Sequence, residues 1–105
     1  DICSVCAIDL VAVERLAASM EPRPKIVSLN PENLEDVLAT INQIGDACGL
    51  EEAAQAAHEG LVTRIAAVDA MVACSHRPNV AFIEWADPIY VGGHWTPQII
   101  RRAGG

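Results

Sequence analysis

Three of the four aromatic residues of this chain, Trp85, Tyr90 and Trp95, lie in one short segment. Aromatic rings bury a large apolar area with little loss of side-chain entropy, so a cluster of them suits a flat macrocyclic ligand. The simpler alternative is that Trp85 and Trp95 only cover the end of a sheet. The residue types alone leave both interpretations open.

The residues between these aromatics would shape the same segment. Asp87-Pro88 and Gly92-Gly93 favour turns, because Pro fixes φ and Gly permits a close approach of the backbone to a ligand; ordinary turn chemistry explains them equally well. His94 could reach a ligand or a metal held within it, although a hydrogen bond at a helix entry is the simpler role. The candidate ligand-binding residues are therefore Trp85, Asp87, Pro88, Tyr90, Gly93, His94 and Trp95.

A second candidate chemistry rests on cysteine. Cys3 and Cys6 form a C-x-x-C pair, which could hold a reactive thiol of lowered pKa or contribute to a metal site. No second pair and no histidine at zinc-site spacing accompanies them, so a local disulfide or a structural role is the simpler interpretation. Cys48 and Cys74, near helix ends, are expected to be buried as small hydrophobic residues.

The sequence offers no arrangement typical of catalysis. Glu84 and Asp87 lie three residues apart, but they have no partner base and no metal motif beside them. No phosphate-binding loop and no nucleophile–base pair stands out. We therefore expect no enzyme activity, no resident cofactor and no metal bound by the protein itself.

The elements that must position these residues begin with a short helix after Asp9, whose carboxylate can cap it. Residues 25–29 (KIVSL) are β-branched and predict a strand. Asn30-Pro31 then predicts the start of a second helix, which Gly49 would end.

A long helix is predicted over 51–73, followed by a strand over 80–84 and a loop over 85–95. Thr96-Pro97 predicts the cap and first residue of a last helix. Strands that alternate with helices favour an α/β fold with parallel strands.

Composition and charge narrow the function further. Of the 105 residues, 51% are hydrophobic and 4% aromatic, which suits packed helices around a small sheet. The net charge is −7, and the only adjacent pair of basic residues is Arg101-Arg102, so binding to nucleic acid is not expected. An acidic domain of this kind could dock onto a basic partner surface.

Three segments resemble the cobalamin and iron-siderophore type of periplasmic solute-binding protein that serves ABC importers. Residues 82–105 (FIEWADPIYVGGHWTPQIIRRAGG) are similar to the first strand, ligand-facing loop and helix of the second lobe. Residues 1–8 (DICSVCAI) look like the closing strand and turn of the first lobe. Residues 27–34 (VSLNPENL) resemble the strand and helix start that precede the interlobe helix.

The resemblance implies two α/β lobes joined by one long rigid helix, with a ligand clamped between them. Residues 1–49 would be the end of the first lobe, 50–75 the bridging helix and 76–105 the start of the second lobe. The resemblance covers essentially the whole chain but only a middle slice of the family's usual length, and the family's early S-x-x-P-S-x-T-E-like segment is absent.

The implied function is binding of a cobalamin-like corrinoid or another metal chelate and its delivery to an ABC permease in the membrane. The parent protein would be periplasmic, or extracellular and membrane-associated. The alternatives are a small redox or metal-binding module built on Cys3 and Cys6, or a unit without independent activity. Because half of each lobe's sheet would be missing, exposed strand edges would need a cover, and a homo-oligomer is expected.

Overall fold

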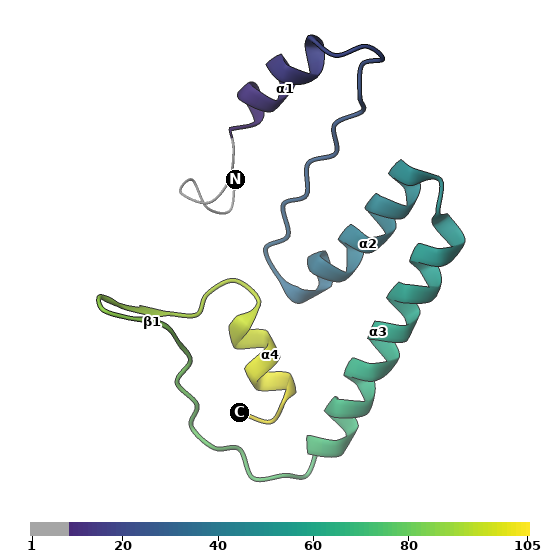
Figure 1. Ribbon diagram of the computed structural model, residues 1–105. Helices are drawn as coiled ribbons and strands as arrows, with labels where there is room; N and C mark the ends of the chain where they lie inside the picture. Colours follow the sequence, from purple (N-terminus) through teal and green to yellow (C-terminus); the bar gives the residue numbers. More distant parts are fainter. Residues whose placement is uncertain (1–8) are drawn as a thin grey trace.

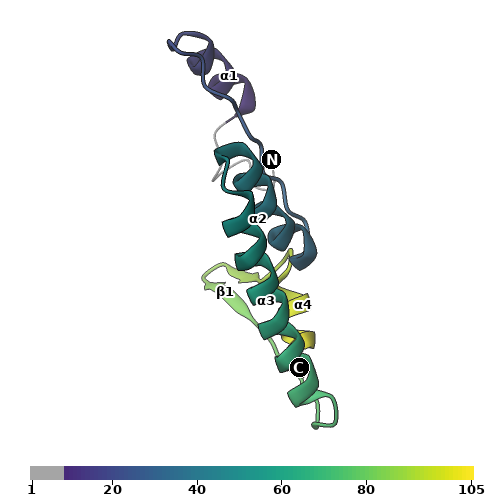
Figure 2. The ribbon, with the colours of Figure 1, turned by 90° about the vertical axis from the view of Figure 1, so that its right-hand side faces the viewer.

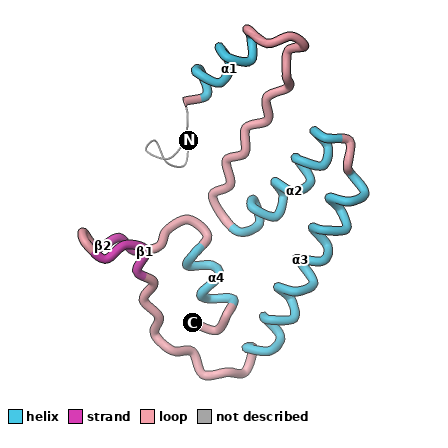
Figure 3. Tube along the Cα trace, in the orientation of Figure 1, coloured by secondary structure: helices cyan, strands magenta, loops and turns pink. Residues whose placement is uncertain are grey.

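The computed structural model describes residues 9–105, which form a mixed α/β structure that is mostly helical (Figure 1). Long connections without regular structure separate the first helix from the second and the third helix from the strands (Figure 3). In chain order the elements are α1 (Leu10–Ala18), α2 (Leu34–Cys48), α3 (Glu51–Val72), β1 (Ile83–Ala86), β2 (Ile89–Val91) and α4 (Thr96–Arg102).

The first helix, α1, begins where the sequence predicts. The backbone N–H of Val11 donates a hydrogen bond of 3.2 Å to the Asp9 side chain, which confirms Asp9 as the N-cap. A cap of this kind satisfies one of the free N–H groups of the first helical turn.

The predicted strand over 25–29 does not form. These residues run as an extended connection between α1 and α2, and no strand among the described residues lies alongside them. Backbone N–H and C=O groups form a strand only by pairing with a neighbour. Val27 and Leu29 are both exposed, so β-branched composition alone did not decide the structure here.

The second helix starts three residues later than the sequence predicted. Asn33, not Asn30, is the N-cap: its side-chain oxygen accepts a 2.9 Å hydrogen bond from the backbone N–H of Asp36. In return, Asp36 accepts hydrogen bonds from the Asn33 side-chain amide (2.8 Å) and from the Glu32 backbone (3.0 Å). This reciprocal pairing outweighs the signal of the proline at residue 31.

The turn between α2 and α3 brings the two helices close together. Gly49 adopts φ 69°, the left-handed conformation predicted for it at a helix C-terminus. Gly45 and Ala54 are both buried, and a side chain built on Gly45 would overlap the Ala54 methyl group. The backbone of α2 at Gly45 therefore packs against the Ala54 side chain of α3. The long helix predicted over 51–73 is confirmed as α3.

The strands form an antiparallel hairpin, so the prediction of parallel strands is wrong. Strand β1 pairs with β2 through Ile83↔Val91, Trp85↔Tyr90 and Ala86↔Ile89. Strand β1 overlaps the end of the strand predicted over 80–84, whereas β2 lies within the segment predicted as a loop over 85–95. A two-residue turn, Asp87-Pro88, joins the strands, and its peptide bond is cis. So short a connection can join only antiparallel strands, because a parallel pair needs a crossover of a dozen or more residues.

The molecule is a thin slab of 57 × 41 × 14 Å, seen edge-on in Figure 2. Its radius of gyration is 18.0 Å, whereas a compact domain of this length has about 13 Å. Within residues 9–105 the buried hydrophobic side chains are Ala17, Leu38 and Ala54. None of the described helices is both long and apolar enough to cross a membrane.

The prediction that Cys48 and Cys74 are buried is also wrong. Both are exposed free thiols. Cys48 is the last residue of α2, and Cys74 lies in the turn after α3.

Candidate ligand-binding site

Trp85 and Tyr90 lie directly opposite each other across the hairpin, so their side chains share one face of it. Both are exposed, Trp85 by 63% and Tyr90 by 59%. The structure thus brings two of the three predicted aromatic residues together on an accessible surface.

The indole of Trp85 is oriented by the turn beside it. Its Nε1–H donates a 2.8 Å hydrogen bond to the backbone carbonyl of Asp87. This contact satisfies the one polar group of the indole and leaves the apolar ring surface free. The predicted residues Asp87 and Pro88 therefore contribute turn geometry and an anchoring carbonyl.

The other face of the hairpin is aliphatic. Ile83 pairs with Val91 and Ala86 pairs with Ile89, and the two residues of β2 flank Tyr90 and so point the opposite way from it. A bulge between Ile83 and Trp85 adds Glu84 as an extra residue on β1. Without this bulge Ile83 and Trp85 would share a face, so the bulge is what separates an aromatic face from an aliphatic face.

Gly93, His94 and Trp95 form a second group, in the connection from the hairpin to α4. His94 has φ 52°, a conformation that non-glycine residues rarely adopt. The rings of His94 and Trp95 lie 5.8 Å apart with an interplanar angle of 41°. Trp95, not the predicted Thr96, is the N-cap residue of α4, and its carbonyl accepts a 3.0 Å hydrogen bond from Ile99.

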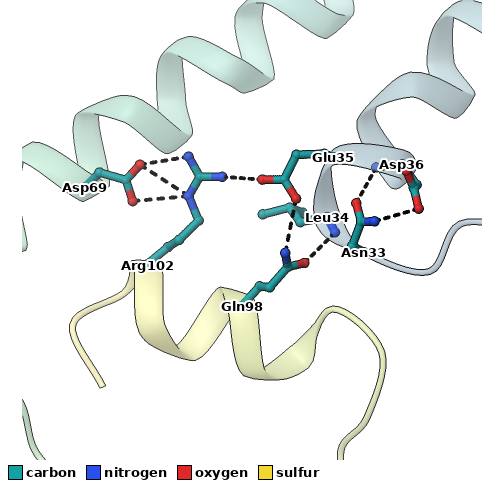
Figure 4. Close-up of polar contacts among 7 residues, drawn as sticks. All are labelled: Asn33, Leu34, Glu35, Asp36, Asp69, Gln98 and Arg102. Carbon is teal, nitrogen blue, oxygen red and sulfur yellow. Dashed lines mark hydrogen bonds and ion pairs between the residues drawn. The ribbon is translucent and has the colours of Figure 1, made fainter.

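A polar network fastens α4, which follows this group, to α2 and α3 (Figure 4). Arg102 donates to both oxygens of Asp69 on α3, the shortest contact being 2.8 Å, and donates to Glu35 on α2 at 3.2 Å. The hydrogen bond from Arg102 lowers the pKa of Asp69, and the bond to Asp69 raises the pKa of Arg102. Both groups therefore stay charged across the physiological range.

Gln98 completes the attachment of α4 to the start of α2. Its side-chain oxygen accepts a 2.7 Å hydrogen bond from the backbone N–H of Leu34, and its amide donates to Glu35 at 3.1 Å. Leu34 is the first residue of α2, whose N–H has no partner within the helix. The members of this network lie on three helices and no local motif links them, so the sequence did not predict it.

An apolar hollow of about 500 Å³ lies where α2, α3 and α4 meet, and the size suits a small-molecule site. Its lining includes none of the seven predicted site residues. This hollow is lined by Leu34, Leu61, Ile65, Ala67, Val68, Ile99 and Ala103, together with Arg64 and Arg102.

The structure offers no direct test of the cysteine hypothesis. Cys3 and Cys6 lie outside the described residues, so the C-x-x-C pair remains a prediction. Among residues 9–105 no group of three or more His, Cys, Asp or Glu side chains is arranged to hold a metal ion.

Comparisons with known proteins place the chain in no family, since no family model, no curated protein and no solved structure matches it. The resemblance to periplasmic solute-binding proteins therefore rests on the three segments quoted from the sequence.

Proposed function

We propose that this chain belongs to the binding component of an ABC importer, which captures a cobalamin-like corrinoid or another metal chelate outside the cytoplasm and delivers it to a membrane permease. The observation that carries the proposal is the exposed pair Trp85 and Tyr90 on one face of the hairpin. Both residues lie within 82–105, a segment that resembles the family, and their exposed rings give a surface chemically suited to such a ligand.

The aromatic face suits a flat ligand for two physical reasons. Residues directly opposite on an antiparallel pair have Cβ atoms about 4.5–5.5 Å apart, so the two side chains can form one continuous platform. The hydrogen bond from Trp85 to the Asp87 carbonyl holds one ring in place before a ligand arrives. A preorganised ring loses less conformational freedom on binding, and more of the contact energy becomes affinity.

Two polar side chains near the platform in sequence, those of Asp87 and His94, would fix the orientation of the ligand. The Asp87 carboxylate lies at the tip of the hairpin, and His94 lies in the connection that follows β2. Sites for small molecules combine a mostly apolar lining with a few such groups. Capture and release need no covalent step, so the proposal assigns no catalytic residue.

The long helix α3 supports the two-lobed architecture that belongs to this proposal. Its 22 residues extend over about 33 Å. It connects the part of the chain assigned to the first lobe with the hairpin and α4, assigned to the second. In this proposal α3 would be the connector between the two lobes, and the contacts of Gln98 and Arg102 with the start of α2 would lie between them.

Calorimetric titration with cobalamin tests the proposal, on this chain and on a version extended by the sequence that flanks it at its source locus. We expect the extended protein to bind, and Tyr90→Ala to weaken its affinity about tenfold, which corresponds to about 1.4 kcal/mol. Ile89→Ala, on the aliphatic face, is the matched control and should leave the affinity unchanged. Absence of binding by both proteins, for cobalamin, siderophore and haem alike, would contradict the proposal.

A further inference from the structure

Within residues 9–105 the aliphatic face of the hairpin is exposed. Ile83, Ile89 and Val91 are all more than half exposed, Val91 by 72%. The opposite face carries Trp85 and Tyr90, so this two-stranded ribbon is apolar on both sides. An isolated hairpin is at best marginally stable in water, and packing of one face against another element is the usual remedy.

The surface of the whole chain is too large for a compact monomer. It exposes 8151 Å², whereas a folded monomer of 11.2 kDa exposes about 5,700 Å². A stable protein interface needs only about 800 Å² from each partner. The excess therefore exceeds what a stable dimer of this chain would require.

The same chain carries a concave apolar surface that matches the aliphatic face. The hollow between α3 and α4 is lined mainly by aliphatic side chains, among them Leu61, Ile65 and Val68. The hairpin of the same chain projects away from α3 (Figure 1). A convex apolar element and a concave apolar site on one chain can meet reciprocally when a two-fold axis relates two copies.

Charge at the two surfaces is complementary. Arg64 lines the hollow, is exposed, and has no hydrogen-bond or ion-pair partner among the described residues. Glu84, the bulged residue on β1, is likewise exposed and has no partner within residues 9–105. A cation beside the hollow and a carboxylate on the hairpin would meet when the two surfaces come together, and such pairs fix the register of an interface.

We propose that two copies of this chain form a symmetric dimer in which the aliphatic face of each hairpin covers the hollow of the other, with Arg64 of one copy facing Glu84 of its partner. The contact is isologous, so it closes at two copies. It leaves Trp85 and Tyr90 on the outer face of the hairpin. The dimer is therefore independent of the proposed ligand and can be tested without it.

Light scattering coupled to size-exclusion chromatography, over a series of protein concentrations, tests this inference. The chain should elute with twice the 11.2 kDa mass of one copy. Arg64→Glu and Glu84→Arg should each weaken the dimer at least tenfold, and the two changes together should restore it. Both side chains are exposed, so circular dichroism should report unchanged helix content in each variant.

A second pair of variants distinguishes the two faces of the hairpin. Ile89→Asp should yield a monomer, whereas Tyr90→Asp, the adjacent residue on the aromatic face, should leave the dimer intact. A monomeric wild-type chain at every concentration would overturn the inference. So would a dimer that tolerates Ile89→Asp, or one that the paired charge exchange fails to restore.

Discussion

The hairpin β1–β2 differs from the helices α2, α3 and α4 in how far its side chains find partners within the chain. The helices have a capped start at Asn33, a close contact between Gly45 and Ala54, and a polar network centred on Arg102. The hairpin has one internal ladder and no buried residue. At these positions the helices have partners within the chain, whereas every residue of β1 and β2 is exposed.

Within this short chain, the residues that stabilise the fold therefore differ from those proposed to bind other molecules. Residues whose partners are present, such as Asp69 and Arg102, explain how the helices are held together. Residues whose apolar surface is exposed, such as Trp85 and Ile89, are the ones to which we assign binding in the two proposals. Changes in the first group should alter the free energy of unfolding, and changes in the second should alter binding.

The largest expected effect on the helical side comes from Leu38→Ala. Leu38 lies on α2 and is only 8% exposed, so losing its side chain should reduce the free energy of unfolding by about 2 kcal/mol or more. Met71→Ala on α3 is the control: Met71 is 79% exposed, and the change should stay within about 0.5 kcal/mol. Urea denaturation followed by circular dichroism measures both, and equal effects would remove the distinction between a packed and an open surface.

Gly45→Ala sharpens the same comparison at the closest helix contact. The new methyl group would overlap Ala54, and the overpacking should destabilise the protein by about 1–3 kcal/mol. Gly60→Ala on α3 meets nothing within 4 Å and should stabilise the helix by up to about 1 kcal/mol. The two glycines should thus shift the urea midpoint in opposite directions, and a shift in the same direction would contradict the packing of α2 on α3.

A smaller, pH-dependent effect should come from Asp69→Asn. Arg102 lowers the pKa of Asp69 below its ordinary value of 3.8, so the pair stabilises the fold above that pH and ceases to do so as the pH falls through the lowered pKa. The variant should melt at a lower temperature than the wild type at neutral pH, and the difference should shrink below pH 3.8.

Asp46→Asn is the matched control for that experiment. Asp46 lies in the last turn of α2, where a carboxylate opposes the helix dipole, so its removal should leave the melting temperature unchanged or raise it slightly. A difference between Asp69→Asn and the wild type that persisted at low pH would show that charge is not the cause.

The sequence predicted those features of the fold that depend on neighbouring residues, and it failed for features that depend on residues far apart in the chain. The cap at Asp9, the end of α2 at Gly49 and the long helix α3 were predicted correctly, because each depends on neighbouring residues. The strand over 25–29 was predicted wrongly, because a strand needs a partner that local composition does not reveal.

The candidate site likewise has features that the local sequence indicates and features that it does not. The aromatic residues of the hairpin were found from their types and spacing, but their pairing across an antiparallel turn was not. The bulge at Glu84, which places Ile83 and Trp85 on opposite faces, breaks the period of two on which strand prediction depends. The hollow depends on three helices far apart in sequence, so no local pattern could indicate it.

Tryptophan fluorescence during a corrinoid titration of the extended protein tests the central claim most directly, because this chain contributes two tryptophans, and Trp85 and Trp95 can be replaced one at a time. After correction for light absorbed by the corrinoid, the account predicts saturable quenching of the Trp85 emission in a Trp95→Phe variant. Adding Tyr90→Ala should move the midpoint of the quenching to an about tenfold higher corrinoid concentration. Binding detected by calorimetry without any change in the Trp85 emission would contradict the claim that the aromatic face of the hairpin contacts the ligand.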